Sequence, residues 1–509
     1  MLSLPGTAQN FRQQFDDFKN KNRKDYESFR REANSQYADF LRNVWEEYSA
    51  IAPVPKPKEP VPLPPVIYEE TVIDENIKID VPINQTPEPV VDVPPVVPDE
   101  NEPVISVQPV TPIEPVVPVV IPAIVPEPQP LPVVPIKEQT VPGEKYWAFD
   151  FYGSREQVRF PEGNRISLAS REGDEIADAW MQLSDGKYDN LVRDCLELRV
   201  VNAMCDWEYL QLLDHLAQSI YGDSDEATLL LAWLFSQSGY QMRLGLDDNK
   251  LYMLFGSKHI IYDRRSFNVD GTSFYPYADD ISRLRIAQIE FPGETPLSLY
   301  IDNEPLSGRP LSDERTITAR RYPGMKITSQ VKTPLIEFFD TYPASAVGGN
   351  MMSRWAMYAN TPLSKETKNL IYPAIKAEID SLSQLDAAQR ILNWIQTGLE
   401  YGDDDEIWGG DRAFFAEETL FYPYCDCEDR SILFSRLVRD LLGLDVALVY
   451  YPGHLATAVR FTDDVKGAKM HIDGAEFTVC DPTYIGAPVG KEMPGMNKSG
   501  IQAIVLNRN

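Results

Sequence analysis

A block of prolines limits what the first part of this chain can fold into. Residues 53 to 142 hold 25 of the 42 prolines, mixed with Val, Ile and Glu. Proline lacks a backbone N–H and has a fixed φ angle, so such a block should form neither a regular helix nor a strand ladder. We expect an extended or disordered spacer, parts of which adhere to the folded body; a docking site for another protein is an alternative. The sequence thus divides into a segment 1–51, a linker 52–143 and a folded remainder.

The segment before the linker carries a repeat typical of an amphipathic helix. Pairs recur every eleven residues, at Phe15 and Phe18, Tyr26 and Phe29, Tyr37 and Phe40, and Tyr48 and Ile51. Eleven residues make about three helical turns, so the pairs should lie along one stripe of a helix over residues 11–51. Two interpretations stay open. The helix associates with a partner helix or a second copy as a right-handed coiled coil, or it packs on its own protein.

Charge and composition exclude several classes of partner. The net charge of −29 argues against nucleic acid and anionic membranes, which would both be repelled. No run of 18 apolar residues exists, so we expect no transmembrane segment. Five cysteines are too few, and odd in number, for a disulfide-stapled fold. The start, Met1 to Gln9, reads like the tail of a secretory signal, which predicts export to the periplasm or cell surface; a cytoplasmic location is the alternative.

The folded remainder contains an internal duplication. Asp270–Phe274 resembles Asp473–Phe477, and the same offset of 203 residues relates Ser224 to Cys427, each at the start of an apolar helix. We therefore predict two copies of one α+β unit, over residues 144–281 and 346–509. Alternating residues between them predict a β-rich segment, 282–345, which forms a small domain or completes the first copy. Its predicted strands are Arg285–Phe291, Leu297–Ile301 and Thr316–Ala319.

Three residues of the second copy form the pattern of a thiol nucleophile with its base. Cys427 begins a predicted helix, Glu428–Leu442, whose N-terminal partial charge would stabilise a thiolate. His454 opens a predicted strand after Pro452-Gly453, and Asp481 closes another beside Pro482. A carboxylate there would accept a hydrogen bond from the far ring nitrogen of His454 and fix its tautomer. This order predicts a Cys-His-Asp site.

The segment Asp426–Gly490 resembles the transglutaminase-like cysteine protease superfamily, which has a papain-like α+β fold. The resemblance implies that Cys427, His454 and Asp481 are the catalytic triad. It also implies an acyl-thioester intermediate and a protein or peptide substrate cleaved at peptide or carboxamide bonds, by a peptidase or amidase that needs no metal or cofactor; transamidation is a variant of this reaction. The alternative is a non-catalytic binding or scaffold protein built from such modules at the cell surface or in the periplasm.

The first copy departs from this pattern. By the same offset it has Ser224 at the nucleophile, Leu251 at the histidine and Ala278 at the acid, with Lys250 and Asp279 adjacent. His259 lies eight residues further along the chain. Without a base Ser224 has no route to activation, so we predict a catalytically dead copy that serves as scaffold or ligand-binding surface.

An aromatic insertion precedes the predicted nucleophile. Trp408, Tyr422 and Tyr424 are the candidates for a substrate-binding lip, and Trp408 or Tyr422 for a role at the oxyanion. Cys425, two residues from Cys427, is a bystander, a redox partner or the reactive thiol itself. A zinc site of Cys425, Cys427 and a histidine is a further alternative, weakened by the lack of a second close cysteine pair. We expect Cys480 to be a core residue.

Overall fold

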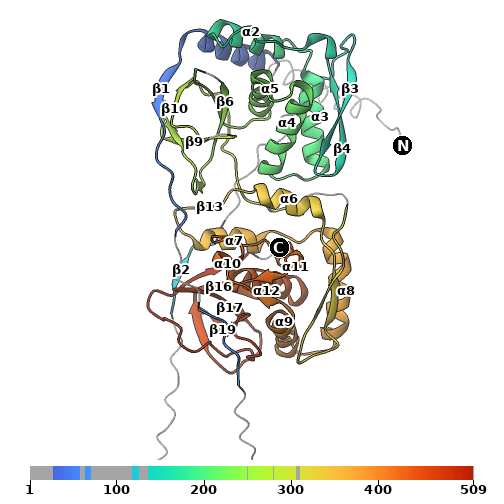
Figure 1. Cartoon of the computed structure of the whole chain (residues 1–509), viewed down its shortest axis with the longest axis vertical. Helices are drawn as coiled ribbons and strands as arrows, with labels where there is room; N and C mark the ends of the chain where they lie inside the picture. The colour runs from blue at the N-terminus through green and yellow to red at the C-terminus, as the bar shows by residue number, and fades with distance from the viewer. Residues whose placement is uncertain are drawn as a thin grey trace, which may run out of the picture.

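The computed structural model describes residues 27–57, 63–69, 117–124, 136–248, 250–278, 280–304 and 310–507. These residues form an α+β protein with two bodies, the upper and the lower in Figure 1. No helix in these ranges combines the length and the apolarity needed to cross a bilayer.

The first body is built on a six-stranded sheet. Its order is β1 (Glu46–Ser49), β10 (Arg283–Ile286), β5 (Met242–Leu246), β6 (Leu251–Gly256), β9 (Thr272–Pro276) and β8 (Phe267–Val269). The helices are α2 (Gly173–Leu183), α3 (Asp189–Val201), α4 (Asp206–Tyr221) and α5 (Asp225–Gln237), preceded by the hairpin β3 (Lys145–Phe151) and β4 (Ser154–Phe160) and the 3-10 turn η1 (Glu162–Asn164). Of these helices, α5 packs directly on β5 and β6 because its apolar residues surround it on nearly every side.

The second body repeats this plan. Its sheet has the order β2 (Val119–Ile121), β20 (Gln502–Val505), β16 (Asp445–Tyr451), β17 (His454–Arg460), β19 (Ala475–Cys480) and β18 (Lys469–Ile472). Its helices are α7 (Met352–Asn360), α8 (Lys365–Ile379), α9 (Gln384–Gly398), α10 (Asp404–Ile407), α11 (Ala416–Phe421) and α12 (Cys427–Leu442). The short strands β14 (Glu400–Tyr401) and β15 (Tyr424–Cys425) pair in parallel just before α12.

The two sheets correspond strand by strand. Counted along the chain, β5, β6, β8, β9 and β10 of the first sheet occupy the same places as β16, β17, β18, β19 and β20 of the second; β7 (Ile260–Ile261) pairs with β13 (Ser345–Ala346) outside the first sheet. Both of the late hairpins, β8–β9 and β18–β19, turn at Asp-Gly with positive φ angles: 50° and 84° at Asp270-Gly271, and 50° and 76° at Asp473-Gly474. Asn or Asp followed by Gly is the pair that adopts this left-handed turn at least cost.

The segment between the bodies does not form a separate β domain. Its first strand, β10, joins the first sheet beside β5, as one of the two alternatives predicted. The hairpin β11 (Arg315–Thr318) and β12 (Lys326–Ser329) contacts α8 and α9 of the second body. Helix α6 (Thr333–Thr341) follows, and β13 (Ser345–Ala346) pairs with β7 (Ile260–Ile261). The predicted strand Leu297–Ile301 is wrong, because this buried stretch packs as irregular chain with only an isolated bridge to Ser257.

The N-terminal helix is shorter than the repeat predicts. Residues 27–43 are helical, and the chain then enters β1 instead of continuing to residue 51. Tyr48 pairs with Leu284 at the free edge of β10, and this tertiary pairing overrides the local helical periodicity. The helix packs on its own protein: Tyr37 is 1% exposed and stacks on Trp180, with ring centroids 4.4 Å apart. The repeats before residue 27 lie outside the described residues.

Parts of the proline-rich linker lie on the folded bodies. Residues 119–121 form β2, in parallel register with Gln502–Ile504, so the prediction that the linker joins no ladder is wrong at this place. The pairing is possible because these three residues lie between Pro118 and Pro122 at the edge of the sheet. The stretches 51–57 and 63–69 also contact folded parts of the chain.

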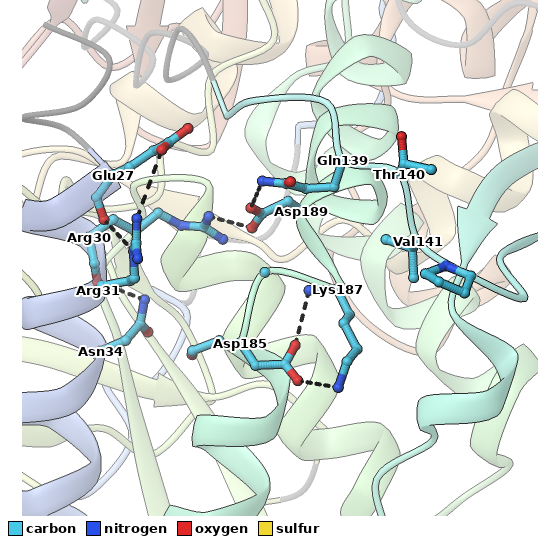
Figure 2. A pocket seen from close by; sticks show the side chains of 13 residues that line it. Glu27, Arg30, Arg31, Asn34, Gln139, Thr140, Val141, Asp185, Lys187 and Asp189 are labelled. Carbon is cyan, nitrogen blue, oxygen red and sulfur yellow. Dashed lines mark hydrogen bonds and ion pairs between the residues drawn. The ribbon is translucent and has the colours of Figure 1, made fainter. Parts of the chain in front are cut away.

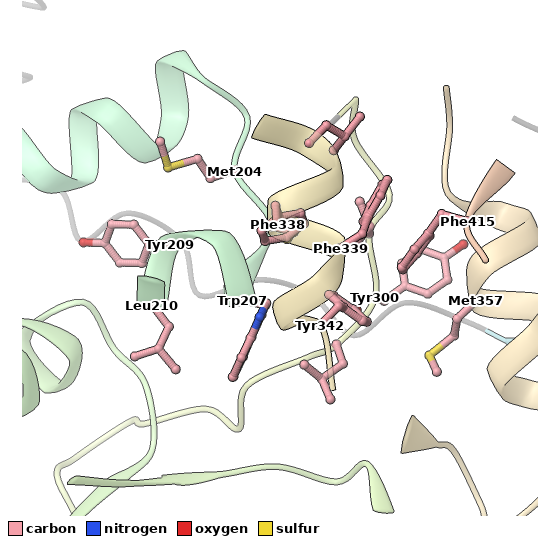
Figure 3. Close-up of a cluster of buried hydrophobic side chains, with 14 of the residues drawn as sticks. Met204, Trp207, Tyr209, Leu210, Tyr300, Phe338, Phe339, Tyr342, Met357 and Phe415 are labelled. Atoms are coloured by element: carbon pink, nitrogen blue, oxygen red, sulfur yellow. The ribbon is translucent and has the colours of Figure 1, made fainter. Parts of the chain in front are cut away.

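One aromatic cluster joins the two bodies (Figure 3). Phe415, in the insertion before α12, stacks on Phe339 of α6 and on Tyr358 of α7, with ring centroids 4.1 Å apart in both pairs. Tyr342 meets the same ring edge-on at 5.3 Å. The cluster is continuous with buried residues of α4, including Trp207 and Leu210, so a single apolar core runs through both bodies.

Candidate functional site

The three predicted catalytic residues lie at the ends of adjacent elements of the second body. Cys427 is the first residue of α12, His454 is the first residue of β17, and Asp481 directly follows β19. Strand β17 pairs with β19 and packs against α12, which brings the three element ends together. A tight turn positions His454: Tyr451 pairs with His454 across Pro452-Gly453, and Gly453 has a φ of +87°.

His454 and Asp481 form a buried pair. Nε2 of His454 lies 3.0 Å from Oδ2 of Asp481, and the two residues are 1% and 3% exposed. The other carboxylate oxygen of Asp481 accepts the backbone N–H groups of Thr483 and Tyr484, at 2.9 and 3.2 Å. An acid held in this way accepts a hydrogen bond from the N–H at Nε2 and leaves Nδ1 as the basic nitrogen. Nδ1 of His454 is buried and has no hydrogen-bond partner.

The thiol of Cys427 lies against the backbone beside this histidine. The N–H of Leu455 donates to Sγ over 3.5 Å, and the thiol donates to Oε2 of Glu428 over 3.2 Å. Neither ring nitrogen of His454 is hydrogen-bonded to Sγ. In the described structure the thiol thus contacts the backbone of the residue next to His454, and not the imidazole itself.

The electrostatics of the thiol differ from the prediction. Burial raises the pKa of Cys427 well above its ordinary value, and the negative charges of Glu428 and Asp426 raise it further. The N-H of Leu455 acts in the opposite direction but is outweighed. The N-terminus of α12 was expected to favour thiolate. The helix instead begins with acidic residues on both sides of Cys427, so the closed site favours the neutral thiol.

Carboxylates gather on one side of Cys427. Three sets of ligand atoms, each lying within 4.8 Å of one another, have cation-binding chemistry: Asp426, Cys427 and Glu428; Asp404, Asp411 and Glu428; and Asp404, Asp426 and Asp429. Burial and the neighbouring charges raise the pKa of Asp404 to about 7 and that of Asp426 well above its ordinary range. Either protons or a bound divalent cation would relieve this repulsion. The sequence indicated an acidic run here but not that Asp404 turns inward.

The predicted zinc site is not supported by this geometry. None of the possible metal sets among the described residues includes Cys425 or a histidine. Cys425 is buried, and its thiol donates to the carbonyl of Glu400 across the β14–β15 pair, 3.6 Å away. Cys480 is fully buried and bonds the carbonyl of Thr478. Both are packed residues with raised pKa values caused first by burial.

Tyr401 is a residue of the site that sequence reasoning missed. It ends β14, and its hydroxyl is buried without a hydrogen-bond partner. Burial raises the pKa of its phenol, and the charge of Cys427 is the next largest cause, which indicates that the two groups are close. An unpaired O–H near the nucleophile is a ready hydrogen-bond donor for an oxyanion. The available signal in the sequence was its place at the start of the aromatic insertion.

The predicted substrate-lip residues are only partly together. The rings of Trp408 and Tyr422 meet edge-on at 4.9 Å, and the guanidinium of Arg412 lies over both, 4.5 and 5.1 Å from their centroids. Tyr424 is 40% exposed in β15, where it pairs with Glu400. Trp408 and Tyr422 thus bind the guanidinium of Arg412, whereas the exposed ring of Tyr424 is accessible to a ligand.

The corresponding place in the first body has different chemistry. Asp225 occupies the first position of α5, and its Oδ1 accepts the N–H of Leu251 over 2.9 Å, as Sγ of Cys427 accepts that of Leu455. Ser224 is the N-cap residue, whose side chain accepts the N–H of Ala227. The nucleophile position therefore falls on Asp225, one residue later than the sequence offset predicts. The carboxylate of Asp225 forms an ion pair with Arg171, whose Nε lies 2.5 Å from Oδ2.

The histidine of the first body has a structural role. His259 is 6% exposed, and its Nε2 accepts the backbone N–H of Leu299 over 3.2 Å. Asp279 lies outside the described residues. The absence of an activated nucleophile from this copy stays a prediction.

A pocket of about 300 Å³ lies elsewhere in the first body, between the N-terminal helix, residues 139–142 and the α2–α3 turn (Figure 2). Arg30 bonds Asp189 at 2.6 Å and Lys187 bonds Asp185 at 2.7 Å. Three acidic and three basic side chains line it, so it presents no net charge, and neither cysteine nor histidine is among its lining residues. We assign it no part in the site around Cys427.

Comparison of the chain with protein-family models, with curated proteins and with solved structures finds no match.

Proposed function

We propose that this protein is a thiol hydrolase of the transglutaminase-like type, with tandem papain-like bodies of which the second is active. One observation carries the proposal. Nε2 of His454 lies 3.0 Å from Oδ2 of Asp481 in a buried pair, and Nδ1 of His454 has no hydrogen-bond partner. The next residue, Leu455, donates its N–H to Sγ of Cys427. Histidine oriented by a carboxylate beside a thiol at a helix start is the arrangement that nucleophilic catalysis requires.

The proposed reaction begins with proton transfer from the thiol of Cys427 to Nδ1 of His454. The sulfur then attacks the carbonyl carbon of a peptide or carboxamide bond, and the carbonyl oxygen becomes an oxyanion. The phenol of Tyr401 and the first free N–H groups of α12 are the candidate donors to this oxyanion. Collapse of the intermediate breaks the C–N bond, the imidazolium protonates the leaving amine, and a thioester remains on Cys427.

Water resolves the thioester by the same route in reverse. His454 takes a proton from water, the hydroxide attacks the acyl carbon, and the sulfur leaves and recovers its proton. A second amine in place of water would give transamidation. Hydrolysis is the proposed outcome because water is the default acceptor of a thioester.

The second candidate function is binding without catalysis. The specific observation in its favour is the raised pKa of a thiol that is only 4% exposed and has two acidic neighbours. In this alternative the second body binds a ligand without reacting with it, and the buried Cys427 is a packed residue.

Alkylation distinguishes the two candidates. The rate of modification of Cys427 by iodoacetamide is followed by mass spectrometry across pH, in the wild-type protein and in His454→Ala. The hydrolase predicts a faster reaction near neutral pH in the wild type, because His454 stabilises the thiolate in the open site. It also predicts that an acyl adduct forms on Cys427 from a peptide library and is absent in Cys427→Ala. Equal, slow alkylation with no adduct would support the binding protein.

A further inference from the structure

Residues 63–69 of the linker lie along the two loops that carry His454 and Asp481. The N–H of Leu63 donates to the carbonyl of Gly453, one residue before His454, over 3.2 Å. The carbonyl of Val66 accepts the N–H of Ile485, and the N–H of Tyr68 donates to the carbonyl of Ile485, both over 2.9 Å. This is a parallel bridge of Ile67 with Ile485. The linker is thus held by its backbone, as an added strand is.

The side chains of this stretch alternate as those of a bound strand do. Leu63, Val66 and Tyr68 pack on a cluster formed by the loop after Asp481, whose members are Tyr484, Ala487 and Met493. The rings of Tyr68 and Tyr484 meet edge-on at 5.6 Å. Ile67, between the two inward residues, is 69% exposed. The surface around Tyr484, Ala487 and Met493 therefore contacts Val66 and Tyr68 on one face of the extended segment and leaves Ile67 in solvent.

The same linker is also fixed on the acidic side of the candidate site. The ammonium of Lys56 lies 3.0 Å from Oδ2 of Asp411, which belongs to a carboxylate set with Glu428, the neighbour of Cys427. Two residues earlier in the extended stretch, the carbonyl of Val54 accepts the N–H of Asp263 of the first body over 2.9 Å. Two anchors of one linker thus lie near residues of the candidate site: Lys56 on Asp411, among the acids, and Leu63 on Gly453, next to the histidine.

We propose that Gly453 and the loop 484–493 form a groove for an extended, proline-containing apolar peptide, and that residues 63–69 occupy it as a built-in ligand that keeps Cys427 closed to substrate. Peptide binding in this groove does not depend on catalysis. Only the identification of such peptides as substrates rests on the proposed hydrolase function. Prolines 64 and 65 suit this occupant, because they hold the chain extended before the bonded N–H of Tyr68.

The attachment of the occupant to the same chain determines how it competes. A ligand tethered by a short flexible linker has an effective concentration on the order of 1 mM, so a free peptide of the same sequence binds the wild-type protein only by displacing it. Apparent affinity is reduced by the fraction of open groove. Weakening the tethered segment should therefore both raise the affinity for free peptide and expose the thiol.

The first test measures peptide binding without reference to catalysis. A fluorescent peptide with the sequence of residues 63–69 is titrated by anisotropy into the full chain carrying Cys427→Ala, with and without Val66→Asp and Tyr68→Asp. We expect the released chain to bind at least about tenfold more tightly. A peptide N-methylated at Tyr68 loses the donor to Ile485 and should bind at least about tenfold more weakly than one N-methylated at Ile67, whose N–H makes no bond.

The second test measures closure of the site. Alkylation of Cys427 is followed by mass spectrometry in the wild-type chain, in Val66→Asp/Tyr68→Asp, and in Ile67→Asp as the control with an outward side chain. The released chain should react at least about tenfold faster than the other two, and free peptide should restore protection. Thermal melting checks that the chains compared are folded.

The outcomes separate the two proposals. The groove proposal would be overturned by equal alkylation rates in all three chains, together with peptide affinities that do not depend on the position of the N-methyl group. Position-dependent binding and faster alkylation establish it. If a released chain binds peptide and exposes Cys427 but forms no acyl adduct, the hydrolase proposal fails and the groove stands.

Discussion

Nε2 of His454 lies 3.0 Å from Oδ2 of Asp481, and both side chains are almost completely buried. The carboxylate is itself held by two backbone N–H groups, so the position of the imidazole is determined by the loop after β19. Nδ1, the nitrogen left without a partner, is the one available to the thiol. Four predictions test how this geometry and its surroundings work.

Asp481→Asn should abolish most activity with little loss of structure. The amide keeps an acceptor oxygen for Thr483 and Tyr484, but its NH₂ group disfavours the tautomer in which Nε2 of His454 carries the proton. We expect kcat to fall by a factor on the order of 10³–10⁴, as for other triads that lose this carboxylate. Hydrolysis of an acyl substrate and circular dichroism are measured together. Unchanged kcat in a folded variant would remove Asp481 from the triad.

Glu428→Gln should make Cys427 more reactive. Oε2 of Glu428 lies 3.2 Å from Sγ, and its charge is the largest cause, after burial, of the raised pKa of the thiol. Removing the charge lowers that pKa, and each unit lowered raises the thiolate fraction about tenfold below the pKa. The pH dependence of iodoacetamide alkylation is the measurement. Glu406→Gln, which changes an exposed acid of the insertion before α12, is the control and should leave the pH dependence of alkylation unchanged.

Tyr401→Phe should separate catalysis from stability. The hydroxyl of Tyr401 is buried without a partner, so its loss should leave the free energy of unfolding equal or slightly higher. If the phenol donates to the oxyanion, kcat should fall by a factor on the order of 10² with little change in KM. Tyr146→Phe, which alters an exposed ring of the first body, is the matched control. A kcat equal to that of the control would exclude the phenol as a donor.

Glu418→Gln should flatten the pH dependence of stability. Burial raises the pKa of Glu418 to about 7, although the N–H of Phe415 and Arg412 act against this. Because the folded pKa lies above the unfolded one, the stabilisation from its bound proton is complete below about pH 4.5 and is lost as the pH rises through about 7. Gln stays neutral, so the free energy of unfolding of the variant should fall less over this window. Urea titrations at several pH values measure the difference; parallel curves for the two proteins would contradict it.

Much of the second body could be predicted locally. The apolar stripe of α12 with Gly443 at its C-terminal end, the Pro452-Gly453 turn and the Asp-Gly hairpins each have one backbone conformation that their residues adopt at low cost. These patterns were enough to place Cys427, His454 and Asp481 at element ends. They also predicted the correspondence of Asp270 with Asp473.

The electrostatics and the coverings of the site were decided only by tertiary structure. Asp404 and Asp411 reach Glu428, the neighbour of Cys427, through a folded insertion, and their effect on charge depends on burial and distances that no spacing encodes. Strand β1 likewise forms because the edge of β10 is open to pairing. Residues 63–69 are held in place because they pack on an apolar cluster far away in the sequence. Local residues determine which backbone conformations cost little free energy. Packing across the whole chain determines which charges meet and which surfaces are covered.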